Sequence, residues 1–210
     1  FDALLDVFKQ SSDLILLREV AKCIECLSWC NRAQDAVHDA KDCEALAHAF
    51  VTHMSDVCIA GQLSGAIWTF CSDNRQTLKL LCKAGVCEAF VAALDMHRLD
   101  AVVVGHACGA IRHIAMQKDQ YHDRLIDLGA CELITEGLAL HSRIPQVATE
   151  GCAAIWNISR HYPDMIPRFN AAGVCEALAA VFLQHNSAAE TVRLAYGAIR
   201  SLTTQHDANV

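Results

Sequence analysis

Histidine residues, which often bind metal ions, recur in this chain at an interval of 44 residues, as His53, His97, His141 and His185. A zinc ion holds its ligands about 2 Å from one point. If the interval marks stacked helical units, equivalent residues lie about 10 Å apart, the packing distance of helices. The four histidines therefore cannot converge on one metal. We predict instead that each ends a helix and hydrogen-bonds the last carbonyl groups of that helix.

Cysteine residues offer a second possible metal or redox site. Cys23, Cys26 and Cys30 lie near one face of a predicted helix. Zinc sites need four ligands, or three ligands and a water, and the sequence has no second Cys-x-x-Cys pair. We therefore predict no metal and no cofactor. The 12 cysteines favour buried, reduced thiols, and with no recognisable secretion signal they favour a cytoplasmic, reducing location.

Catalytic motifs are missing from the sequence. It contains no Gly-x-x-x-x-Gly-Lys-Ser phosphate loop, no Gly-x-Ser-x-Gly elbow and no His-Glu-x-x-His metal motif. A nucleophilic cysteine needs a base held within hydrogen-bond reach in a pocket, and no spacing here predicts one. We predict that the chain is not an enzyme.

The elements that carry these residues form an internal repeat. Four Cys-Glu pairs, beginning at Cys43, Cys87, Cys131 and Cys175, are 44 residues apart, and four Ala-Ile pairs follow the same interval. Two series in one register, with a period of this length, are typical of a helical solenoid. The composition, 53% hydrophobic and 20% charged, fits a large continuous core. No apolar run reaches the roughly 20 residues that cross a bilayer, so we expect no membrane insertion.

Residues 73–116 illustrate one unit. Capping residues begin a short first helix, which ends at Gly85, because glycine suits the left-handed turn after a helix. A second helix is predicted over 86–96 and a third over 101–116, where apolar residues follow helical spacing. The chain then divides into a partial repeat over 1–30 and repeats over 31–72, 73–116, 117–160 and 161–204. Because the first segment resembles the middle of a unit, we expect a longer parent protein.

These motifs resemble the armadillo repeat. The resemblance rests on Ala-Gly-Val-Cys-Glu-Ala-Leu at 172–178, followed by Gly-Ala-Ile-Arg-x-Leu at 197–202, and it extends over nearly the whole chain. It implies an all-α, right-handed superhelical solenoid of three-helix repeats. It also implies that the third helices line a concave groove in which partners lie as extended peptides. A two-helix HEAT-type solenoid is the main alternative.

One position on the predicted third helices alternates between two residue types, as Trp68, Arg112, Trp156 and Arg200. A core position would be apolar throughout, and Trp and Arg are the side chains most enriched at binding hot spots. Small residues that precede them, such as Gly61 and Gly65, would leave room for a peptide. Packing of each Trp against the next unit is the competing interpretation. The predicted groove comprises Trp68, Thr69, His106, Arg112, His113, Glu150, Trp156, Asn157, Arg160, Arg193, Arg200 and Ser201.

The predicted function is a protein-protein interaction scaffold. Importin-α-like proteins hold basic peptides with a Trp four residues before an Asn, and only Asn157 matches that pattern here. Arginines at the C-terminal end of the groove favour an acidic or mixed-charge peptide. The net charge of −7 disfavours nucleic acid as the main ligand. Two alternatives stay open: an assembly subunit that self-associates or joins a cytoskeletal complex, and a regulatory segment of a larger enzyme.

Overall fold

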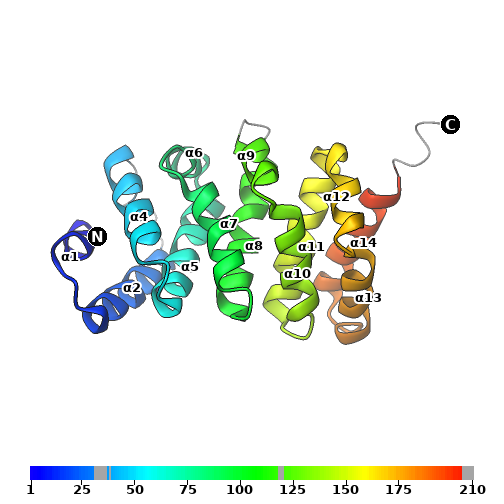
Figure 1. Cartoon of the computed structure of the whole chain (residues 1–210), viewed down its shortest axis with the longest axis horizontal. Coiled ribbons are helices and arrows are strands. Elements are labelled where there is room, and N and C mark those ends of the chain that lie inside the picture. The colour runs from blue at the N-terminus through cyan, green and yellow to red at the C-terminus, as the bar shows by residue number, and fades with distance from the viewer. Residues whose placement is uncertain (31–36, 38, 118–120, 205–210) are drawn as a thin grey trace.

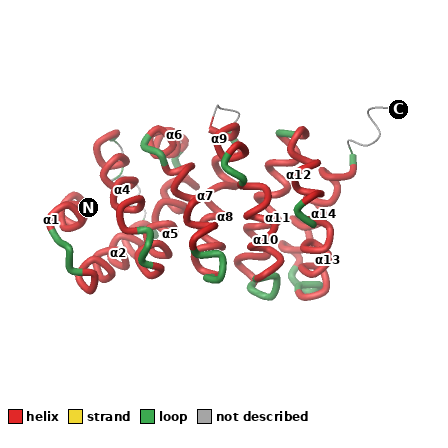
Figure 2. The backbone as a smooth tube through the Cα atoms, viewed as in Figure 1, coloured by secondary structure: helices red, strands yellow, loops and turns green. Residues whose placement is uncertain are grey.

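The computed structural model describes residues 1–30, 37, 39–117 and 121–204 (Figure 1). Within these ranges all regular secondary structure is helical, which confirms the all-α prediction. Short loops join the helices (Figure 2). The helices are α1 (Asp2–Gln10), α2 (Leu14–Ser28), α4 (Ala40–His53), α5 (Val57–Asp73), α6 (Arg75–Lys83), α7 (Val86–Met96), α8 (Ala101–Met116), α9 (Tyr121–Asp127), α10 (Ala130–Leu140), α11 (Pro145–His161), the 3-10 turn η1 (Pro163–Met165), α12 (Ile166–Ala171), α13 (Val174–Gln184) and α14 (Ala189–Thr203).

The helices stack into an elongated array with α1 at one pole and α13 and α14 at the other (Figure 1). One layer contains α4, α7, α10 and α13, and we call it the outer layer. The other contains α2, α5, α8, α11 and α14, and we call it the inner layer. Successive helices of the inner layer pack on one another more extensively than those of the outer layer do. We call the solvent-facing side of the inner layer the inner face.

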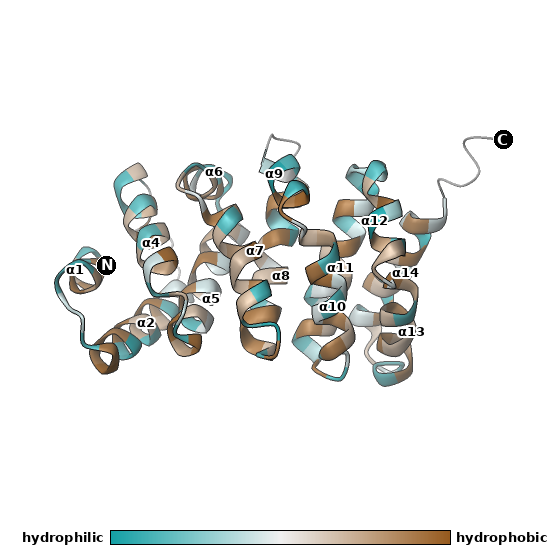
Figure 3. Cartoon of the chain, in the orientation of Figure 1, coloured by the Kyte–Doolittle hydropathy of each residue, from teal (hydrophilic) through white to brown (hydrophobic). Residues whose placement is uncertain are grey.

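A single core runs through the whole array. It is one connected cluster of buried apolar side chains that extends from Leu5 to Leu202. Apolar residues accordingly recur on helices along the full length of the array (Figure 3). Phe50 of α4 and Phe90 of α7 are fully buried, with ring centroids 5.4 Å apart, and so connect neighbouring helices of the outer layer. Each unit of a solenoid depends on such contacts with its neighbours.

Three glycines make the turns before the outer helices. Gly85, Gly129 and Gly173 have φ angles of 95°, 90° and 83° and immediately precede α7, α10 and α13. Glycine adopts this left-handed conformation without the steric penalty of a side chain. The turn predicted at Gly85 is therefore present, and the glycines at the next two repeat intervals make the same turn.

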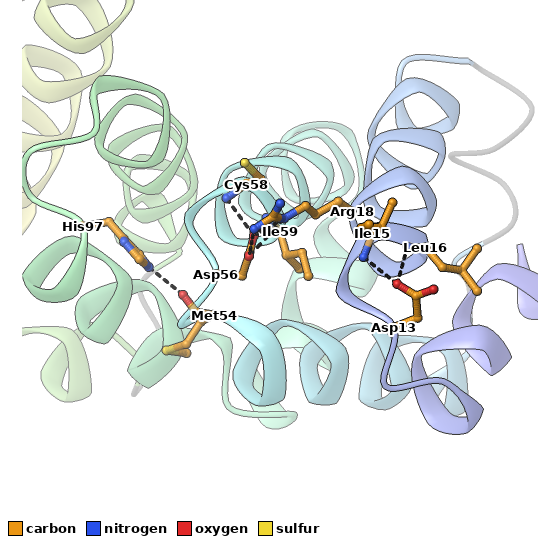
Figure 4. A network of polar contacts seen from close by, with 9 residues as sticks. All are labelled: Asp13, Ile15, Leu16, Arg18, Met54, Asp56, Cys58, Ile59 and His97. Atoms are coloured by element: carbon orange, nitrogen blue, oxygen red, sulfur yellow. Dashed lines mark hydrogen bonds and ion pairs between the residues drawn. The ribbon is translucent and has the colours of Figure 1, made fainter.

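Aspartates begin several inner helices. The carboxylates of Asp13, Asp56 and Asp100 accept hydrogen bonds from backbone N–H groups in the first turns of α2, α5 and α8. These bonds satisfy donors that have no partner inside the helix. Asp56 also pairs with Arg18, whose Nη2 lies 2.6 Å from Asp56 Oδ2, and this contact joins α2 to α5 (Figure 4). In α11, Pro145 occupies the first turn, where a missing backbone N–H costs nothing.

The histidine series connects one repeat to the preceding one. His97, His141 and His185 end α7, α10 and α13, as the sequence predicts. The prediction that each bonds carbonyls of its own helix is wrong. Their Nε2 atoms lie 2.5 Å, 2.8 Å and 2.7 Å from carbonyl oxygens of Met54, Arg98 and Ser142, just beyond the ends of α4, α7 and α10.

The reason is that the backbone already closes each helix. The N–H of His97 donates to the carbonyl of Ala93 at 2.9 Å, and the side chain then reaches past the helix end to the neighbouring one (Figure 4). There it supplies a donor to a carbonyl group at a helix terminus, where intrahelical partners run out. In contrast, the ring of His53 packs beside Phe8, with centroids 5.4 Å apart.

No single described helix is both long and apolar enough to cross a membrane. The one pair that reaches this length together, Pro163–Ala171 with Val174–Gln184, is bent by 79°.

Candidate functional site

Three side-chain pairs cross the inner face between consecutive inner helices. The Trp68 ring of α5 stacks obliquely on the His106 ring of α8, with centroids 5.7 Å apart. Arg112 of α8 pairs with Glu150 of α11, with Nη1 and Oε2 3.1 Å apart. The guanidinium carbon of Arg193 in α14 lies 5.5 Å from the centre of the Trp156 ring of α11. The structure thus brings six of the predicted groove residues together as three contacts between neighbouring repeats.

Trp68 and Trp156 each pack on a glycine of the next inner helix. A Cβ atom added to Gly109 would lie 2.6 Å from Trp68 Cε2, and one added to Gly197 would lie 2.6 Å from Trp156 Cδ2. Arg112, at the equivalent position, is followed by Ala153 where the tryptophans have glycine. The inner surfaces of the two rings are therefore packing surfaces. Both side chains stay partly exposed.

The prediction that free space lies beside Gly61 and Gly65 is wrong. Side chains of this chain fill it. A Cβ atom on Gly65 would collide with Glu25 Oε1 and meet His106 at 2.8 Å, and one on Gly61 would meet Val102 at 3.5 Å. Helical spacing within one unit cannot reveal this, because the atoms belong to neighbouring units.

Several predicted groove residues form the buried floor of the inner face. The exposed fractions of Thr69, His106 and Glu150 are only 8%, 7% and 8%. The hydroxyl of Thr69 donates to the carbonyl of Gly65 at 3.0 Å, and His106 Nδ1 lies 2.9 Å from the carbonyl oxygen of Gly61. These polar groups are engaged within the chain. Direct contact between them and a partner stays a prediction.

Burial also shifts the pKa values of ionisable groups in and beside this floor. It raises the pKa of the Glu150 carboxyl, against the opposing effect of Arg112. Likewise burial lowers the pKa of His106, against the hydrogen bond to Gly61, and raises the pKa of Glu25. Glu25 Oε1 lies 4.0 Å from His106 Nε2. The shifts favour the neutral form of each group, because desolvation penalises charge.

Two further predicted groove residues, Asn157 and His113, contact Arg112. Asn157 Nδ2 donates to the carbonyl of Arg112 at 3.5 Å, and His113 Nε2 lies 3.1 Å from Arg112 Nη2. These contacts surround the Arg112–Glu150 pair. None of these three residues lines the cleft between α11 and α14.

A cleft of about 570 Å³ lies between α11 and α14. Five predicted groove residues line it, and four further residues were not predicted. The predicted five are Trp156, Arg160, Arg193, Arg200 and Ser201, and the others are Ser159, Tyr196, Gly197 and Thr204.

Tyr196 is the notable residue that sequence reasoning missed. Its equivalents in the preceding units, Cys108 and Cys152, are buried, so helical spacing assigns the position to the core. Tyr196 is nevertheless 62% exposed. The signal in the sequence is the change from a small thiol to a large phenol at one repeat position.

Charge is unevenly balanced around this cleft. Arg193 donates two hydrogen bonds to Glu190, of 2.9 Å and 2.6 Å. In contrast, the guanidinium groups of Arg160 and Arg200 have no hydrogen bond or ion pair with any residue that the structure describes. The lining therefore combines two uncompensated positive charges with two aromatic rings and several hydroxyl groups.

The three neighbouring cysteines Cys23, Cys26 and Cys30 lie exposed on or just beyond α2. Within the described ranges, His, Cys, Asp and Glu side chains form no group of three or more that could hold a metal ion.

Comparison with known proteins gives likeness in structure alone. No family model matches the sequence, and no curated protein is detectably similar to it. A designed armadillo repeat protein in complex with the peptide (KR)4 has a TM-score of 0.68 and 21% identity, over 95% of this chain and 80% of that one. An engineered protein of a structural genomics consortium has a TM-score of 0.74 and 22% identity, over 96% and 80%. A second designed armadillo repeat protein has a TM-score of 0.56 and 18% identity, over 95% and 100%.

Proposed function

Because the chain has the armadillo-repeat fold, we propose that it is a non-catalytic scaffold that binds an extended segment of a partner protein along its inner face. A stacked array of rigid helices offers a long preformed surface. The ordering cost of binding then falls mainly on the peptide.

The observation that carries this proposal is the open cleft between α11 and α14. The Trp68–His106 and Arg112–Glu150 contacts cross the inner face between repeats, whereas this cleft keeps about 570 Å³ of space beside Trp156 and Tyr196. Aromatic side chains and arginine supply most of the binding energy at protein interfaces. The cleft is therefore the proposed anchor point, and the remaining inner face guides the rest of the peptide.

Charge favours an acidic or mixed-charge peptide. One structural neighbour is a designed protein in complex with (KR)4, a peptide of basic residues. The arginines in the cleft have the same sign of charge as such a peptide and would repel it. The proposed ligand therefore differs in charge from the one in that complex.

Selection of peptides from a random display library tests the proposal. Binding of the selected peptides is measured by fluorescence anisotropy for the wild-type protein and for Tyr196→Ala, which truncates an exposed ring of the cleft. Loss of a hot-spot aromatic should weaken binding by roughly 30-fold or more. Leu183→Ala is the matched control, because Leu183 is a large, 77% exposed residue of the outer layer.

Equal binding by wild type and Tyr196→Ala, or failure to select any peptide, would contradict the proposal. Weaker binding by Leu183→Ala alone would move the interface to the outer layer and favour an assembly role.

We also propose a reducing, cytoplasmic location. All 12 cysteines are free thiols, and five of them are exposed. Free exposed thiols persist where the cell keeps cysteines reduced. Fractionation of cells followed by thiol-trapping of the protein tests this location, and an oxidised protein in a secretory fraction contradicts it.

A further inference from the structure

We propose that the α11–α14 cleft binds a phosphorylated side chain of the partner peptide. This inference rests on the proposed function, since it assigns a chemical identity to the residue that the cleft anchors.

The charge balance of the arginines supports a dianionic ligand. Most arginines of the described chain face a carboxylate, as in the pairs Arg18–Asp56, Arg112–Glu150 and Arg168–Glu132. Arg160 and Arg200 line one cleft, and no described carboxylate pairs with either. A phosphate ester carries about −1.5 to −2 charges at neutral pH, which matches these two positive charges. A single carboxylate would leave one of them uncompensated.

The type of cation points the same way. The cleft contains arginine and no lysine. The planar guanidinium group presents a fixed fork of donors that fits phosphate oxygens in a bidentate manner, whereas lysine offers a point charge. Arg193 is already held by Glu190 and lies against the Trp156 ring, so it serves as part of the wall.

The two aromatic rings supply the other half of the site. One face of the Trp156 ring packs on Gly197, and its remaining surface borders the cleft together with exposed Tyr196. Rings beside a cationic centre can cover the aliphatic or aromatic part of a phosphorylated residue and its neighbour. The combination suits a peptide better than a long polyanion, because Arg160 and Arg200 both line this one cleft beside two aromatic rings.

Two matched peptide libraries test the inference. Both are degenerate apart from a central serine, threonine or tyrosine, which is phosphorylated in one library and unmodified in the other. The strongest sequences are then measured by fluorescence anisotropy as phosphorylated, unmodified and glutamate-substituted peptides. The protein variants are Arg160→Gln with Arg200→Gln, and the control Arg75→Gln with Arg143→Gln. The control removes two arginines that are also exposed and without a described partner, but lie outside the cleft.

We expect enrichment from the phosphorylated library. Loss of one charge-assisted contact weakens binding about tenfold, so the cleft double variant should bind roughly 100-fold more weakly. The control should change affinity by less than about threefold, because separated surface charges are screened by salt. Circular dichroism confirms that both variants remain folded, which their exposed positions lead us to expect.

The contrary outcomes separate the two proposals. Equal selection from both libraries, or full phosphopeptide binding by the cleft variant, would overturn the phosphate site and leave peptide binding intact. Equal losses in the cleft variant and the control, with competition by heparin, would show nonspecific polyanion binding and overturn the site. If neither library yields a ligand, the proposed function itself fails.

Discussion

Two glycines of the inner helices, only one of them beneath a tryptophan, give opposite predictions for substitution by alanine. Gly61 in α5 and Gly109 in α8 are both buried and both lie inside helices. Alanine at either position improves helix propensity by about 1 kcal/mol. The two substitutions differ only in what the new methyl group meets. At Gly61 it meets Val102 at 3.5 Å and Val103 at 3.8 Å, which is ordinary contact.

At Gly109 the new methyl group collides with an indole. Three ring atoms of Trp68 lie 2.6 Å, 2.7 Å and 2.9 Å from the added Cβ atom. A rigid ring must move as a whole, and overpacking of this kind costs about 1–3 kcal/mol. After the gain in helix propensity, we expect Gly109→Ala to destabilise the protein by about 1 kcal/mol. Gly61→Ala should stabilise it by about 1 kcal/mol.

Urea unfolding followed by circular dichroism measures both changes. In thermal unfolding, each kcal/mol corresponds to about 2–4 °C for a chain of this size. The double variant Trp68→Ala, Gly109→Ala adds a cycle, because removal of the ring should abolish the penalty of the methyl group. If Gly109→Ala raises stability as Gly61→Ala does, or if the penalty persists without Trp68, the packing argument is refuted.

Three further predictions concern the inner face, the ends of the outer helices and the thiols. His185→Ala should destabilise the protein by about 1–2 kcal/mol in urea unfolding, because it leaves the carbonyl of Ser142 without its donor; an unchanged midpoint would contradict this. Burial raises the pKa of the Glu150 carboxyl, so in the folded protein this group stays protonated at pH values above its unfolded pKa of about 4.3. The stability that Glu150 contributes is therefore lost as the pH rises through the folded pKa. The unfolding free energy of wild type minus that of Glu150→Gln should therefore decrease as the pH rises from about 4 to 7. A constant difference would show that Glu150 does not titrate in this way. Labelling of the native protein with a thiol reagent, read by mass spectrometry, should modify only the five exposed cysteines, Cys23, Cys26, Cys30, Cys58 and Cys175. The reason is that burial raises the pKa of buried thiols, as for Cys108, to about 12. Rapid labelling of buried thiols would contradict the packing.

Much of the fold follows from the sequence because stacking imposes one spacing on every element. The glycine turns at Gly85, Gly129 and Gly173 and the helix ends at the histidines lie where the interval of 44 residues predicts them. A turn that needs a positive φ selects glycine in every unit. Such positions can be read from a single sequence.

Contacts between units are harder to derive. Helical spacing shows which face of a helix leaves its own core, but not which atoms of the next unit meet it. For this reason the direction of the His97 side chain and the filled space beside Gly65 were predicted wrongly. One signal was available. Glycine follows Trp68 and Trp156 by 41 residues, at Gly109 and Gly197, whereas alanine follows Arg112 at the same distance.

This alternation constrains how a gene of this kind can change length. Unequal crossing-over adds or removes whole repeats. Loss of the 44 residues that form α6 to α8 would place Trp68 opposite Ala153, whose methyl group occupies the space that the ring needs. Loss of twice that length would place Trp68 opposite Gly197, a compatible seat. At the junction after α5, loss of two repeats therefore keeps a glycine under Trp68, whereas loss of one costs about as much as Gly109→Ala, about 1 kcal/mol.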